Sequence, residues 1–260
     1  GSNGNTPAIR DQQATEDWLN WYANKPQDQP SFSFVFYDAV YGYDFTAEFN
    51  QEFSPTAGRI KYAKMADEYG ADMEKLYDSS VQYVDSLAGK ILDKLEQSSQ
   101  LENTMVIITG DHGHELNDNG QDFWGHNSNL ANSQIKVPFI IIDKNFNQQK
   151  PEKICRNLTS HYDLVPTIMK NLLGTTNGAS DYSCGVDLFS DFSYRKWVLS
   201  SAKKKYLDYF GVIQQDYTIK LLPSGFYQFL DNRNSPIAET EEINYEQINQ
   251  AFEMVEKFTH

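Results

Sequence analysis

Two residues with metal-binding side chains follow directly after an apolar segment. Residues 105–108 are apolar, Thr109 and Gly110 come next, and the chain then reaches Asp111 and His112. A carboxylate and an imidazole are ligands of the kind that Zn, Mn and Mg sites use. The structural alternative is that Asp111 caps a following helix and His112 is satisfied within the fold. We expect a divalent metal site (Zn, Mn, Mg or Ca) with Asp111 and His112 as ligands.

A further histidine, His126, lies downstream in a loop rich in Gly, Asn and Asp. His126 lies in Trp124-Gly125-His126-Asn127, and it can return from this loop toward Asp111 and His112 as a third ligand. A lone histidine in such a loop is otherwise an exposed turn residue, and the sequence leaves both interpretations open. His114 and Glu115 are close to the pair, but adjacent side chains on a strand or tight turn point apart. We therefore expect these two residues to surround the ligands and not to bind the metal.

The elements around these residues alternate between strand and helix. The apolar run Met105 to Ile108 is typical of a buried strand in a parallel sheet, and ligands bind beyond the carboxyl ends of such strands. A helix with an apolar stripe from Met73 to Leu95 precedes it, and Val137 to Ile142 forms a further strand. Ser31 to Tyr37 is expected to be another strand of the sheet. The pattern predicts an α/β fold with a mixed, mainly parallel central sheet flanked by helices.

The C-terminal part of the chain, from residue 201 on, has a different character. Short runs at residues 209–213, 217–222 and 226–230 are joined by turns and predict a small antiparallel meander. An amphipathic helix around Tyr245 to Phe258 closes the chain. We expect residues 1–200 to form the α/β portion and residues 201–260 to complete the same domain.

Upstream, Asp163 caps a helix that ends near Gly174, which gives Asp163 and His161 structural roles.

Composition limits the classes of partner. The chain has 260 residues with 40% hydrophobic content, enough for a substantial core. Its formal net charge of −14 disfavours nucleic acid as a partner. No run reaches the roughly 18 apolar residues of a membrane span. The two cysteines, Cys155 and Cys184, either form one disulfide, worth about 3 to 4 kcal/mol in the chain-entropy model, or are unrelated thiols in a reduced protein.

Several ordered motifs together resemble the sulfatase and alkaline-phosphatase superfamily. They are residues 103–113, the downstream Gly125-His126, Val137-Pro138 before a strand, residues 163–167 and the terminal antiparallel hairpin. The resemblance implies that Asp111 and His112 are metal ligands and that His126 contacts the substrate or a second metal. It also implies that the Ser, Thr or modified Cys nucleophile lies upstream, so no catalytic residue is assigned here. Active relatives commonly carry a histidine in the loop that follows the strand expected at residues 31–37, and this chain has Tyr41 there.

Other segments resemble the periplasmic domain of the YejM (PbgA) family of inner-membrane proteins. These segments are residues 14–21, 185–189 and 197–202. The resemblance implies a location at the periplasmic face of the bacterial inner membrane, with the membrane anchor outside this chain. It implies a sensor or regulator in lipopolysaccharide or cardiolipin homeostasis, with membrane lipid or lipopolysaccharide and an inner-membrane regulatory protein as partners. The competing hypothesis is an active metal-dependent phospho- or sulfoester hydrolase or a phosphoethanolamine-type transferase.

Overall fold

The computed structural model describes residues 6–26, 28–49, 70–144, 154–204, 207–222, 224–238 and 245–258. Contacts within the chain divide it into two compact units. Unit 1 comprises residues 1–107 and 141–144, and unit 2 comprises residues 108–140 and 145–260. The sequence-based division at residue 200 falls inside unit 2, and it remains a prediction.

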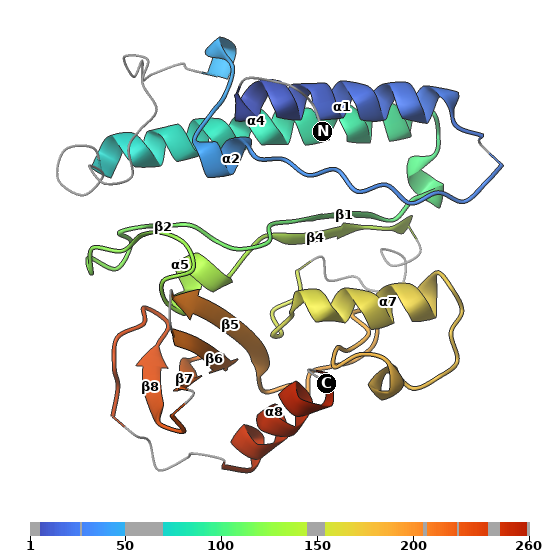
Figure 1. The fold of residues 1–260 in the computed structure, drawn as a ribbon. Helices are drawn as coiled ribbons and strands as arrows, with labels where there is room; N and C mark the ends of the chain where they lie inside the picture. The colour runs from blue at the N-terminus through green and yellow to red at the C-terminus, as the bar shows by residue number, and fades with distance from the viewer. Residues whose placement is uncertain are drawn as a thin grey trace. The chain divides into compact units, whose positions relative to one another are not determined.

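Helical elements come first along the described chain, and the strands begin at Val106 (Figure 1). Up to residue 142 they are α1 (Pro7–Asn24), α2 (Ala39–Gly42), η1 (Ala47–Phe49), α4 (Gly70–Gln97), η3 (Leu101–Asn103), β1 (Val106–Thr109), β2 (Glu115–Leu116), β3 (Trp124–Gly125), α5 (Asn132–Ile135) and β4 (Phe139–Ile142). After residue 153 they are η4 (His161–Asp163), α7 (Leu164–Asn171), η5 (Ala179–Asp181), β5 (Val198–Lys204), β6 (Leu207–Ile213), β7 (Tyr217–Leu221), β8 (Tyr227–Asp231) and α8 (Tyr245–Phe258). Within the described ranges, no helix is both long and apolar enough to cross a bilayer.

The long helices α1 and α4 make up much of unit 1. Trp18 and Tyr22 of α1 are buried with Leu95 of α4 in one apolar cluster. The Tyr83 hydroxyl of α4 donates a hydrogen bond to the Ala8 carbonyl at 2.7 Å. The apolar stripe that predicted α4 is thus confirmed as a buried face, with Met73 fully buried near its start.

The strand expected at residues 31–37 is absent, which corrects the sequence prediction. Its alternation is nevertheless preserved: Trp18 Nε1 donates to Ser33 Oγ, and Tyr37 Oη bonds Thr15 Oγ1. The three phenylalanines at the alternate positions are exposed, at 85% for Phe32, 79% for Phe34 and 60% for Phe36. The described part of the chain pairs no strand with this segment, and a sheet strand needs a hydrogen-bonded neighbour as well as a two-residue alternation.

The strands expected near residues 105–108 and 137–142 are confirmed. They are β1 and β4, and they pair with each other in a two-stranded sheet. Strand β1 ends at Thr109, so Gly110 and Asp111 follow it directly. The chain therefore delivers Asp111 to the end of a sheet strand, as the sequence predicted.

The meander and the terminal helix of unit 2 are confirmed. Strands β5 to β8 form an antiparallel sheet in that order. The core between this sheet and α8 consists of buried apolar side chains, namely Val212, Ile219, Leu221, Phe229, Ile248 and Ala251. The first strand, β5, was not predicted, because Ser200 and Ser201 interrupt its apolar pattern.

Candidate functional site

The site begins where β1 ends in unit 2. The Asp111 side chain is 69% exposed, and its Oδ1 accepts a hydrogen bond from the backbone N–H of His112 at 3.0 Å. The His112 side chain is 33% exposed. Its Nδ1 lies 2.8 Å from the Gly113 carbonyl oxygen, which can only accept, so Nδ1 carries the proton in this contact. In the neutral ring Nε2 then offers a lone pair.

Asp111 and His112 form a two-donor arrangement. Nε2 of His112 lies 3.7 Å from Oδ1 of Asp111. Zinc–nitrogen and zinc–oxygen bonds are each about 2.0 to 2.2 Å long, so one ion can contact both atoms after a small adjustment. The pair fits a divalent cation, although its roles as ligands remain predictions.

His126 joins the pair from the other end of the loop. Its ring stacks on that of His112, with centroids 4.1 Å apart and planes within 8° of parallel. The His114 ring is 6.1 Å from that of His126 and tilted by 41°. The fold therefore gathers three imidazoles beside Asp111, including His114, which the sequence placed next to the ligands.

The environment keeps two of these imidazoles neutral. Burial, followed by the nearby His126 and His112, lowers the pKa of His114 from 6.5 to about 4. Burial and then His112 also lower the pKa of His126. Neutral imidazoles are metal ligands, whereas protonated ones are not. The cluster is thus better suited to supplying lone pairs than to binding an anion through positive charge.

The stacked geometry limits how many of these donors can meet at one ion. An imidazole lone pair lies in the plane of its ring, and the planes of His112 and His126 are nearly parallel. Their lone pairs therefore do not converge on one point. In agreement, no group of three His, Cys, Asp or Glu side chains able to hold a metal occurs among the described residues. Catalytic zinc sites use about three protein ligands, so this donor set fits a catalytic metal only in part.

His161 is a further residue at this strand end, and the sequence gave it only a structural role. Its Nε2 and Thr109 Oγ1 form a hydrogen bond at 3.0 Å. Its ring packs edge-on against Phe139 of β4, with centroids 5.9 Å apart. Thr109 is two residues before Asp111, so His161 contacts the segment that leads into Asp111 and His112. No local motif links residues 109 and 161, which is why sequence analysis missed this contact.

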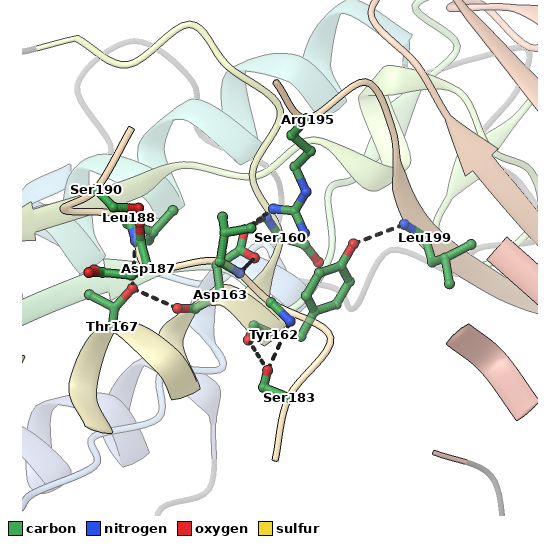
Figure 2. A network of polar contacts seen from close by, with 12 residues as sticks. Ser160, Tyr162, Asp163, Thr167, Ser183, Asp187, Leu188, Ser190, Arg195 and Leu199 are labelled. Carbon is green, nitrogen blue, oxygen red and sulfur yellow. Dashed lines mark hydrogen bonds and ion pairs between the residues drawn. The ribbon is translucent and has the colours of Figure 1, made fainter. Parts of the chain in front are cut away.

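A buried ion pair fixes the turn that carries His161 (Figure 2). Asp163 is fully buried, and its Oδ2 lies 2.6 Å from Arg195 Nη1. The same carboxylate accepts from the backbone N–H of Ser160 at 2.7 Å and from that of Val186 at 2.9 Å. The carboxylate of Asp163 thus closes a capping box at η4, while α7 follows as expected from the sequence. Asp163 occupies the N-cap position of α7, but its side chain makes no capping bond to that helix, so its structural role lies in the η4 capping box and the ion pair with Arg195.

Neighbours of Asp163 extend this network toward the meander. The Tyr162 hydroxyl accepts from the backbone N–H of Leu199 in β5 at 3.1 Å, and Arg195 lies over the Tyr162 ring (Figure 2). A Cβ atom on Gly185 would come within 2.2 Å of the Tyr162 carbonyl oxygen. Only glycine permits this close approach. The segment after α7 is therefore locked to the turn that carries His161.

The remaining residues singled out from the sequence are Tyr41 and the two cysteines. Tyr41 is on α2 in unit 1 and is 46% exposed. Cys155 is exposed and Cys184 is partly buried, and the structure contains no disulfide between them. Their spacing in the sequence could not decide the matter, because a disulfide also requires Cα atoms within about 7 Å and facing Cβ vectors.

Comparison with known proteins gives consistent matches. The profile of the family described as "Sulfatase" matches residues 2–175. The inner membrane protein YejM of Salmonella typhimurium is 23% identical over 230 residues, which cover 88% of this chain and 33% of that protein. An uncharacterized protein of Haemophilus influenzae is 34% identical over 48% of this chain and 20% of its own length. The chain therefore spans a third or less of these curated relatives.

Solved structures with a similar fold cover nearly all of this chain. The phosphonate monoester hydrolase of Agrobacterium radiobacter superposes with a TM-score of 0.72 at 15% identity, over 93% of this chain and 59% of that one. The putative sulfatase yidJ of Bacteroides fragilis superposes with a TM-score of 0.62 at 20% identity, over 96% and 57%. At these identities the likeness shows the fold alone. It confirms the mixed α/β class predicted from the sequence.

Proposed function

The chain belongs to the sulfatase family, and from this premise we propose that it serves as a regulatory or sensing domain of a YejM-like inner-membrane protein. In this proposal the domain faces the periplasm and responds to lipopolysaccharide or another membrane lipid such as cardiolipin. An inner-membrane regulatory protein is the partner that receives the signal. The similarity to YejM over 88% of the chain supports this assignment, as does the name of that relative as an inner membrane protein.

One observation favours regulation over catalysis. The His112 and His126 rings are stacked in parallel planes, so they do not direct two lone pairs to one ion. Asp111 and His112 alone supply fewer donors than the three protein ligands of a catalytic zinc site. Among the described residues, this arrangement thus offers a pair of metal donors on a sulfatase fold and fewer protein ligands than a catalytic zinc site uses.

A second candidate is an active metal-dependent phospho- or sulfoester hydrolase, or a phosphoethanolamine-type transferase. The 3.7 Å separation of Asp111 Oδ1 and His112 Nε2 favours it, since this pair is arranged to share one divalent cation. When bound, such an ion would polarise the transferred group. In that case the remaining ligands and the nucleophile come from outside the described residues, and the His126 ring turns out of its stack.

Complementation in cells separates the two candidates. Cells lacking the parent protein receive the wild type, Asp111→Ala, His112→Ala or the control Asp122→Ala, an exposed carboxylate of the same loop. Lipopolysaccharide level and outer-membrane permeability are measured, with immunoblots to confirm equal amounts of protein. The regulatory proposal predicts wild-type behaviour for all three variants. Loss of complementation by Asp111→Ala and His112→Ala alone would instead support the enzyme.

A further inference from the structure

Glu115 is a fully buried carboxylate with an unusual set of partners. It follows His114 directly and has no exposed surface. Its Oε1 accepts from the side-chain amide of Asn119 at 2.9 Å. Its Oε2 accepts from Asn129 Nδ2 at 2.8 Å and from Gln134 Nε2 at 2.6 Å. No cationic side chain of the described residues forms an ion pair with it, so three neutral amides take the place of water around a buried charge.

Two of these amides organise the chain just after His126. Gln134 Oε1 accepts from the backbone N–H groups of Ser128 at 2.9 Å and Asn129 at 3.3 Å. Asn129 Oδ1 accepts from the backbone N–H of Ala131 at 2.8 Å. Each amide group therefore donates to Glu115 and accepts from the backbone through its oxygen, and Gln134 Nε2 also donates to Ser128 Oγ at 2.7 Å. The carboxylate thereby fixes the segment that begins two residues after His126.

Gly113, just before Glu115, is in close contact with Ser133 and Gln134 at the far end of the loop. A Cβ atom on Gly113 would lie 2.2 Å from the Ser133 carbonyl oxygen, and the Gly113 N–H donates to the Gln134 carbonyl at 2.8 Å. Glu115 also pairs with Gly125 across the β2–β3 ladder. The residues on both sides of the carboxylate are thus tied to the stretch that contains and follows His126.

We propose that Glu115 is a positioning residue whose buried carboxylate closes the 115–134 loop and thereby holds the His126 ring on the His112 ring. A carboxylate suits this role because both oxygens only accept, and three donors point at them. A glutamine would turn its own N–H₂ group toward one of these donors and lose part of the arrangement. The inference rests on the contacts of this loop and on the ring stack that the structure shows.

The test compares ring contacts in variants of the 260-residue chain by NMR. Histidine-labelled wild type, Glu115→Gln, Glu115→Ala and Asp118→Asn are examined for the nuclear Overhauser effect between the His112 and His126 rings. Asp118→Asn removes a carboxylate charge from the exposed part of the same loop and leaves the amide contacts of Glu115 in place. The proposal predicts the full effect in Asp118→Asn, a reduced effect in Glu115→Gln and its loss in Glu115→Ala.

A purely structural role gives a different result. If Glu115→Ala lowers the unfolding temperature but keeps the wild-type effect between the two rings, the proposal is overturned. Should Glu115→Ala fail to fold, Asn129→Ala takes its place, because it removes one donor to Oε2 and the bond to Ala131. That variant is also predicted to lose the ring contact, and an unchanged contact in it would equally overturn the proposal.

Discussion

The replacement Asp163→Asn tests whether the buried ion pair holds unit 2 together. The Asp163 side chain is fully buried and that of Arg195 is 7% exposed, so neither charge is compensated by water. The carboxylate accepts three hydrogen bonds, from Arg195, Ser160 and Val186. Asparagine offers only one acceptor oxygen, and its N–H₂ group then faces another donor. Breaking a buried pair by removing one partner costs about 3 to 5 kcal/mol.

The assay is equilibrium urea unfolding followed by circular dichroism. In thermal unfolding, a loss of about 3 to 5 kcal/mol lowers Tm by roughly 6 to 20 °C, because 1 kcal/mol corresponds to about 2 to 4 °C for a protein of this size. Lys170→Met is the matched control, because Lys170 pairs with Asp187 at 2.9 Å but its side chain is 58% exposed. Lys170 is the exposed member of this pair, and Asp187, which is 9% exposed, keeps its hydrogen bonds from Asn171 and Phe189 in the variant, so the expected loss is about 1 kcal/mol. A loss in Asp163→Asn no larger than that in Lys170→Met would refute the reasoning.

Three further predictions concern pH, glycine and thiols. The His114 pKa is about 4 in the folded state and 6.5 ordinarily, so the unfolded chain binds more protons between these values. The free energy of unfolding should therefore fall as pH decreases from about 6.5 to about 4, and this slope should be weaker in His114→Gln in pH-dependent urea titrations. Gly113→Ala should lower Tm because its Cβ would lie 2.2 Å from a carbonyl oxygen, whereas Gly89→Ala, which has open space in helix α4, should stabilise by about 0.5 to 1 kcal/mol. Dithiothreitol should leave Tm unchanged because Cys155 and Cys184 are not bonded, and a lower Tm in reductant would contradict this.

Elements that bury a complete face by themselves could be predicted from the sequence. Helix α4 spans 28 residues and carries its apolar stripe from Met73 to Leu95, and β6 to β8 are consecutive strands joined by short turns. Their patterns depend on neighbours close in the sequence. The segment at residues 31–37 shows the limit of this reasoning: its alternation was recognised, but whether it pairs depends on a partner that no local pattern specifies.

The candidate site was predictable only in part for the same reason. Asp111 and His112 follow a recognisable strand, and they lie at its end as predicted. Glu115 and His161 acquire their contacts through partners 19 and 52 residues away, Gln134 and Thr109. Residue type and spacing do not encode such contacts, because they depend on how the loop and the turn are packed.

The central claim is that this domain regulates without a complete metal centre, and bound metal tests it most directly. The full-length protein is purified, incubated with Zn, Mn, Mg and Ca in turn, dialysed and subjected to elemental analysis beside Asp111→Ala and His112→Ala. The account predicts that the wild type retains well under one equivalent of any ion, like both variants. One equivalent of metal in the wild type that is lost in both variants would contradict the account and establish Asp111 and His112 as ligands of a complete centre.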